Sequence, residues 1–265
     1  MNEILVTIPT ILEHDKRYHL IEHLQQEPEV AAVLVVDNGR NFQLTPERQQ
    51  AWSKLQVIRP VCNLNWLHSN NLGAVLALER QLEYVCFLND DVRLSGDFFA
   101  GMLAAFQARP QAGIVVPRYN GFFGDQAKRG RRRKFVPKNH QVEARWVDGT
   151  CMLIPTAVLH HVGLLDPCFR HPGWGADVDY SYRLVQAGYQ LIVTHRSMLW
   201  HHESIGGLSA SKIYGSQEAW TARGFQQARE DLETKYGPNW GEVLPLPKGA
   251  YQPRPPRRAK RRKRS

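Results

Sequence analysis

Two acidic segments and a pair of histidines carry the side chains best suited to chemistry in this chain. Residues 89–91 read Asn-Asp-Asp after an apolar run, and Asp177 follows a Gly-Trp-Gly turn at residues 173–175. His201 and His202 come later. Carboxylates bind Mg²⁺ and Mn²⁺, and a neutral imidazole is a ligand for Mn²⁺-type sites. A carboxylate left exposed by a flexible turn can act as a general base. These residues predict a metal-assisted group transfer.

Backbone geometry predicts which way these side chains face. Along an extended segment, alternate residues point the same way. Asn89 and Asp91 should therefore share a face, with Asp90 opposite. We expect Asp91 to contact a metal and Asn89 to bond a sugar or ribose. An Asx-type turn or helix cap and a pair of ordinary loop histidines are the alternatives, and at most one of His201 and His202 should be a ligand.

A helix should begin near the second acidic segment. Asp177 and Asp179 would lie in its first turn, where the helix dipole favours negative charge, so helix capping is an alternative to catalysis for one of them. Asp179 has Arg183 four residues later, which predicts an ion pair on one helix face. This pairing leaves Asp177 as the candidate general base.

Strand-like and helix-like segments alternate through the first half of the chain. This alternation predicts an α/β fold with a mostly parallel sheet and helices on both faces. We expect Asn71 to cap a helix that carries Val75, Leu78 and Leu82. The expected strands are residues 4–8, 30–36, 55–58, 84–88, 114–116 and 190–194, and the other expected helices include residues 18–24, 156–161, 177–186 and 217–236.

Two polar clusters follow predicted strands. Residues 37–39 read Asp-Asn-Gly after one strand, and residues 89–91 follow another. Open α/β sheets bind their ligands at the carboxyl ends of the strands. The two clusters should therefore lie at one ligand-binding edge.

Charge and cysteine content narrow the class of protein. The 265 residues carry a net charge of +9, but residues 253–265 hold eight basic residues and no acid, which leaves +1 on the rest. This tail should be disordered; it is either a solubilising end or a contact for anionic membrane or an acidic polymer. Four dispersed cysteines, no signal peptide and no apolar run of about 18 residues predict a cytoplasmic protein without a transmembrane segment, peripheral at most at the inner face of the membrane.

The motifs, taken in chain order, resemble those of a family 2 glycosyltransferase with the GT-A (Rossmann-like) fold. The resemblance runs over roughly residues 4–205. Two positions depart from the family: Asn89 stands where aspartate is frequent, and Ala176 where glutamate is frequent. The segments that carry the resemblance are residues 6–10, 35–39, 71–74, 87–91, 148–149, 162–166, 174–179 and 201–204.

The resemblance implies an inverting hexosyltransferase. Asp177 would be the catalytic base, with Asp91 and His201 binding Mn²⁺ or Mg²⁺. The implied acceptor residues are Asp148, Trp174 and Gly175. The implied nucleotide-sugar residues are Pro9, Thr10, Asp37, Asn38, Asn71, Asn89 and Asp90.

The same resemblance implies partners and a division of the chain. Residues 1–117 would bind the donor, residues 118–141 form a basic surface loop, residues 142–240 bind the acceptor and carry catalysis, and residues 241–265 form the basic tail. The donor would be a UDP-, dTDP- or GDP-sugar and the acceptor a glycan or lipid-linked glycan, in cell-surface glycan or polysaccharide synthesis. A nucleic-acid-binding protein using the tail, a metal-dependent nucleotide-sugar hydrolase or nucleotidyltransferase, and a transferase that only binds nucleotide are the alternatives.

Overall fold

The first half of the chain builds four parallel strands. The computed structural model describes residues 3–120, 124–127, 136–170, 173–201 and 215–244. Neighbouring strands in the order β3-β2-β1-β4 all run parallel. The strands are β1 (Ile4–Thr10), β2 (Val30–Asp37), β3 (Leu55–Ile58) and β4 (Tyr84–Leu88), and the helices between them are α1 (Asp15–Gln26), α2 (Pro46–Ala51) and α3 (Asn65–Glu79).

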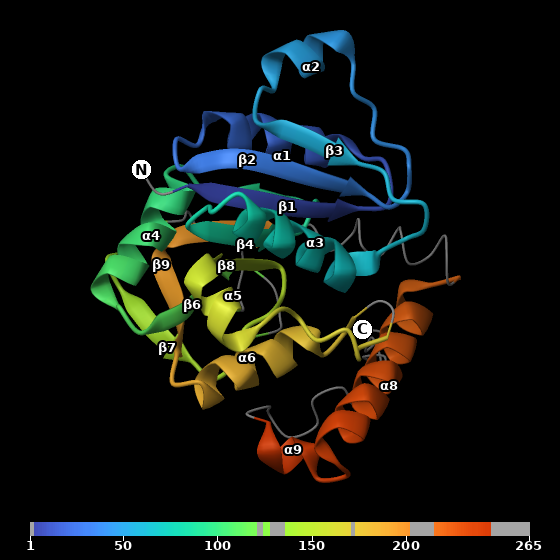
Figure 1. Ribbon diagram of the computed structural model, residues 1–265, viewed down its shortest axis with the longest axis vertical. Helices are drawn as coiled ribbons and strands as arrows, with labels where there is room; N and C mark the ends of the chain where they lie inside the picture. Colours follow the sequence, from blue (N-terminus) through green and yellow to red (C-terminus); the bar gives the residue numbers. More distant parts are fainter. Residues whose placement is uncertain (1–2, 121–123, 128–135, 171–172, 202–214, 245–265) are drawn as a thin grey trace, which may run out of the picture.

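Helices cover both faces of this parallel half (Figure 1). Ile4, Val6 and Ile8 of β1 share a buried cluster with α1, whereas Leu5 shares the cluster that includes Leu67 of α3. Alternate residues of a strand point to opposite faces, so a continuously apolar strand suits a sheet that is covered twice. The expectation of an α/β sheet with flanking helices is confirmed.

The second half of the sheet is mixed. β8 lies antiparallel beside β4, with Leu88 opposite Cys151, and separates β4 from β6. β9 runs parallel to β6, while β5 and β7 are antiparallel to it. The described residues thus form a nine-stranded sheet. The added strands are β5 (Val92–Leu94), β6 (Ala112–Tyr119), β7 (Gln141–Ala144), β8 (Cys151–Pro155) and β9 (Gln190–His201).

An ion network around a buried carboxylate joins α6 to α8, two helices of the second half. The Asp179 carboxylate on α6 is fully buried and meets Arg183 at 2.9 Å, as predicted, together with Lys235 and the hydroxyl of Tyr236 on α8. Lys235 also reaches Asp166 at 2.6 Å. The helices of this half are α4 (Phe98–Ala108), α5 (Thr156–Val162), α6 (Ala176–Gln186), α8 (Gln217–Tyr236) and α9 (Trp240–Val243).

One helix start differs from its prediction. α3 begins at Asn65, so the expectation that Asn71 caps this helix is wrong. The Asn65 side chain accepts hydrogen bonds from the amides of Leu67 and His68 at 2.8 and 3.3 Å and so supplies the cap. The helix ends before Leu82, which packs beyond it.

Most of the two basic segments of the sequence lies outside the residues that the structure describes. Arg118 belongs to β6, and Gln141 begins β7. The basic run at residues 128–134, His202 and the tail at residues 253–265 are outside the described residues. Within the described ranges, no helix combines the length and the apolar character needed to cross a bilayer.

Candidate functional site

Four polar side chains from distant segments meet around the ends of β4, β8 and β9. Asp91 follows β4, Asp148 precedes β8, His201 ends β9, and Asp177 lies in the first turn of α6. The antiparallel pairing of β4 with β8 and of β5 with β9 brings these chain ends together. We call these four residues the acidic site.

Asp91 and His201 are in direct contact. The His201 Nε2 atom lies 3.0 Å from Asp91 Oδ1, and the Asp91 side chain is nearly fully buried. The backbone of His201 is held by Asn120, whose Oδ1 accepts from the His201 amide at 2.6 Å. Asp90 points elsewhere and meets His14 Nε2 at 3.2 Å, as the alternation of an extended segment requires.

Asp148 sits in a tightly bonded turn. Its Oδ1 accepts from the Thr150 amide at 2.9 Å and from the Thr150 hydroxyl. The Gln126 side chain bonds the amide and the carbonyl of Asp148, at 3.1 and 3.0 Å. Burial raises the pKa of the Asp148 carboxyl, while the hydrogen bonds from Thr150 and then the nearby His201 oppose that rise.

Asp177 faces the same turn. Its Oδ2 accepts from the Gly149 amide at 3.1 Å and its Oδ1 from the Val178 amide at 2.9 Å. Burial, and then the charge of Asp148, raise the pKa of Asp177 to about 7. A carboxylate with a pKa near neutrality is suited to take a proton at physiological pH.

The loop before Asp177 is wedged between two helices. Gly173 and Gly175 both have φ of +93°, which favours glycine, and a Cβ on Gly173 would lie 2.9 Å from Leu67 of α3. The Trp174 ring packs against Gly224 of α8. Trp174 also meets the rings of Trp220 and Phe225, at 5.8 and 5.4 Å between centroids. The predicted acceptor residue Trp174 therefore belongs to an aromatic cluster with α8, and Gly175 directly precedes α6, which carries Asp177.

The Asp37 carboxylate is directed into the protein. It is fully buried, accepts from the amides of Asn41 and Phe42 at 3.0 Å each, and lies 3.3 Å from Arg59 Nε. Asn38 accepts from the Leu64 amide at 2.8 Å and donates to Ser69 Oγ at 3.0 Å. Both side chains shape the loop after β2.

The other residues predicted to bind the nucleotide sugar lie along the same edge of the sheet and on α3. Pro9 is half-buried, and Thr10 Oγ1 accepts from Arg17 at 3.1 Å. The Asn89 amide donates to the Thr150 carbonyl at 3.0 Å. The side chain of Asn71 bonds both the carbonyl and the amide of Leu165, at 2.8 and 3.0 Å. Asn71 thus anchors a loop of the second half onto α3.

Sequence reasoning missed four residues that shape this edge: Arg17, His14, Asn65 and Trp66. Trp66 lies so close to Gly149 that a Cβ there would be 2.6 Å from its ring. His14 and Asn65 resemble ordinary loop polar residues in the sequence. The asparagines at residues 63–71 indicated that a helix starts in this stretch, but residue type alone did not separate Asn65 from Asn71.

The fit of a divalent cation rests on Asp91 and His201. A buried carboxylate and an imidazole 3.0 Å apart suit Mn²⁺-type coordination. Within the described residues no group of three or more His, Cys, Asp and Glu side chains forms a complete metal site. Water and the oxygen atoms of a bound diphosphate would have to supply the other ligands, as is usual for Mg²⁺ and Mn²⁺.

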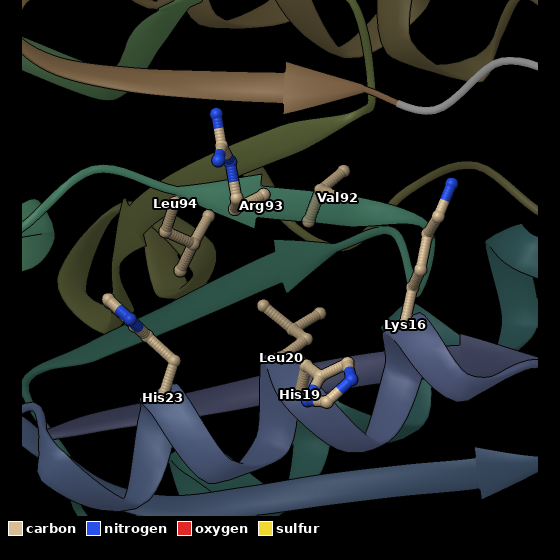
Figure 2. A pocket seen from close by; sticks show the side chains of 7 residues that line it. All are labelled: Lys16, His19, Leu20, His23, Val92, Arg93 and Leu94. Carbon is tan, nitrogen blue, oxygen red and sulfur yellow. The ribbon is translucent and has the colours of Figure 1, made fainter.

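A separate groove lies between α1 and β5 and is not the acidic site. Figure 2 shows its aliphatic floor of Leu20, Val92 and Leu94, with nitrogen-bearing side chains around it. Its volume is about 240 Å³. None of its lining residues is acidic, so it offers no carboxylate for proton or metal chemistry. The other lining residues are Lys16, His19, His23 and Arg93.

One comparison with known proteins bears on the fold. No protein-family model matches this chain. Proteins called uncharacterized from Mycobacterium bovis and Mycobacterium tuberculosis are 28% identical over 259 residues, which covers 92% of this chain and 95% of theirs. The crystal structure of GalNAc-T7 with UDP, GalNAc and Mn²⁺ matches with a TM-score of 0.59 and 14% identity, over 76% of this chain and 43% of that longer one. The chain therefore has a fold similar to the GT-A fold of glycosyltransferases.

Proposed function

We propose that this chain is a metal-dependent, inverting glycosyltransferase that moves a sugar from a nucleotide-diphosphate donor to an acceptor hydroxyl. One observation carries the proposal. On a GT-A-like sheet, Asp177 has a raised pKa and a fixed orientation, and it lies in one acidic site with the Asp91–His201 pair. Inverting transfer of a sugar from such a donor to a hydroxyl needs both a proton acceptor and a site that stabilises the leaving diphosphate.

The base acts on the acceptor. Asp177 takes the proton of the attacking hydroxyl as the oxygen forms its bond to the anomeric carbon. The bond from that carbon to the diphosphate oxygen breaks on the opposite side, so the configuration inverts. The Gly149 amide holds the carboxylate in place during this step, and Trp174 forms the wall against which the acceptor lies.

Asp91 and His201 would hold the cation. A bound Mn²⁺ or Mg²⁺ supplies Lewis-acid stabilisation of the leaving diphosphate. The Asp91 carboxylate has a fixed position from which to bind a cation, because it is nearly fully buried and its backbone continues directly into β5. His201 is fixed through its backbone by Asn120.

The donor nucleotide lies at the ends of β1 and β2 in this proposal. The residues proposed to contact the nucleotide lie at or just after the ends of β1, β2 and β4: Pro9, Thr10, Asn38, Asn89 and Asp90. Asp37 contributes by ordering the loop that follows it, because its own carboxylate is buried and bonded to backbone amides. A place in cell-surface glycan or polysaccharide synthesis would follow if the acceptor is a glycan or a lipid-linked glycan.

The direct test is product analysis with the full chain. Nucleotide sugars are first screened by thermal shift with and without Mn²⁺, since a ligand that binds only the folded state raises the Tm. The stabilising donor is then incubated with glycan acceptors. A glycosylated acceptor of inverted anomeric configuration supports the proposal. Free sugar as the only product shows a hydrolase, and a chain that no nucleotide sugar stabilises is not this enzyme.

A further inference from the structure

Arg17 of α1 is a charged side chain in the interior. Its relative exposure is 1%, and it is the largest fully buried side chain of the described residues. Burying a guanidinium group is costly unless its donors are bonded. The burial of this guanidinium group therefore requires a structural or functional reason, and the proposed chemistry gives Arg17 no role.

Two loops receive the hydrogen bonds of this guanidinium. Nη1 donates to Thr10 Oγ1, the Leu12 carbonyl and Asn41 Oδ1, at 3.0–3.1 Å. Nη2 donates to the Asn41 carbonyl at 2.9 Å and to the Tyr18 hydroxyl at 3.1 Å. Thr10 is the last residue of β1 and Leu12 follows this strand, whereas Asn41 belongs to the loop after β2. Arg17 therefore fastens one loop to the other.

The two loops also touch directly. The Asn38 amide donates to the Thr10 carbonyl, and the Asn41 side chain donates to the Ile11 carbonyl, both at 2.8 Å. A Cβ on Gly39 would lie 1.8 Å from the Ile11 oxygen, so no larger residue fits there. These loops follow the carboxyl ends of β1 and β2, which is the edge where open α/β sheets bind ligands.

The charge of Arg17 is bonded mainly to neutral oxygen atoms. Its ion-pair partner among the described residues is Glu13, half-exposed and 3.8 Å away. The nearby Asp37 is instead bonded to Asn41 and Phe42 and paired with Arg59. A planar group with five donors can bond both loops at once, which a lysine ammonium cannot do. These contacts indicate that Arg17 serves to connect the two loops by hydrogen bonds and not mainly to form an ion pair.

We infer that Arg17 is a positioning residue of the donor site, which touches no substrate and holds the loops after β1 and β2 in the shape that receives the donor nucleoside. This inference rests on the proposed function. Without Arg17 the loops must be ordered by the donor itself, and that ordering lowers affinity. The base Asp177 and the Asp91–His201 pair lie on other segments, so the chemical step should be unaffected.

The test is a separation of KM from kcat in Arg17→Gln and Arg17→Lys. We expect the donor KM and the Kd of the free nucleotide to rise at least about tenfold in Arg17→Gln, with kcat at saturating donor and the acceptor KM within about threefold of wild type. Arg17→Lys should recover only part of the affinity. Arg48→Gln is the matched control, because Arg48 lies 3.9 Å over the same Tyr18 ring and bonds neither loop through its side chain.

Each outcome decides the inference. Unchanged donor KM and nucleotide Kd in Arg17→Gln overturn it, and so does a loss confined to kcat. If Arg17→Gln does not fold, Asn41→Ala replaces it, since Asn41 is the partner on the second loop; the same rise in donor KM supports the inference and wild-type values overturn it. If wild-type protein binds no nucleotide sugar, the proposed function falls first, and that result is visible before any variant is made.

Discussion

Replacing Asp177 with asparagine should lower activity and raise stability at alkaline pH. The variant keeps the size of the side chain but loses the proton acceptor. General base catalysis contributes typically about 10²–10⁴-fold, so turnover should fall by that factor while donor binding is kept. Wild-type turnover should itself rise with pH through about 7, because only the ionised Asp177 carboxylate accepts a proton.

The stability effect follows from the same pKa. The folded-state pKa of about 7 stands about three units above the ordinary value of 3.8, and each unit corresponds to about 1.4 kcal/mol. A carboxyl whose pKa is raised on folding stabilises the fold fully below pH 3.8 and loses that stabilisation as pH rises to 7. The full difference is about 4 kcal/mol; we halve it to about 2 kcal/mol because the side chain is partly exposed and solvent screens it. One weakened hydrogen bond offsets about 1 kcal/mol.

Urea unfolding at pH 8 and pH 4 measures this difference. Asp177→Asn should be about 1 kcal/mol more stable than wild type at pH 8, and no more stable at pH 4. Asp97→Asn, at an exposed position before α4, is the control and should not become more stable than wild type at pH 8. A variant with equal effects at both pH values, or with wild-type turnover, refutes the role assigned to Asp177.

Three further substitutions address the metal pair, the turn and the ion network. Asp91→Asn should weaken the activation of transfer by Mn²⁺ at least about tenfold, measured as the metal concentration for half-maximal rate; equal activity of this variant in chelator would contradict the metal role. Gly149→Ala should reduce turnover, because its Cβ would lie 2.6 Å from the Trp66 ring and displace the amide that orients the Asp177 carboxylate. A crystal structure of the variant should show that the Trp66 ring has moved. An unmoved ring together with wild-type turnover would contradict the role of the Gly149 amide in orienting Asp177. Lys235→Met should lower the free energy of unfolding by about 2 kcal/mol, since hydrogen bonds to charged groups contribute about 1.5–3 kcal/mol, and should leave donor KM unchanged; chemical denaturation at pH 7 measures it, and an unchanged midpoint would show that Asp179 is satisfied without it.

The local elements were largely predictable from the sequence. The helix at residues 217–236 was predicted with the bounds it has, because residues spaced along one side of a helix are a local signal. The start of α3 was not, since the cap comes from Asn65, at φ +55° within the first helical turn, and not from a residue before it. The insertion of β8 between β4 and β6 leaves no local pattern, as it depends on pairing residues 84–88 with residues 151–155.

The acidic site shows the same division. The motif order indicated that Asp91, His201 and Asp177 belong together, and the structure places His201 3.0 Å from Asp91. Their ligand and base roles stay predictions. The orientation of Asp37 into the protein and the anchoring of Leu165 by Asn71 could not be read from residue type, because an acid or amide at a strand end serves a ligand and a loop equally well.

The long strand β9 has a consequence for biosynthesis. Its residues 190–201 provide the sole strand partner described for β5 and for β7, and the longest pairing of β6. On the ribosome, the parallel half can assemble once residues 3–88 have emerged, but β5 (Val92–Leu94) and β7 (Gln141–Ala144) keep open edges until β9 (Gln190–His201) has been translated. Unpaired edges of this kind invite association with other chains, so the emerging polypeptide passes through a stage in which protection by chaperones matters most.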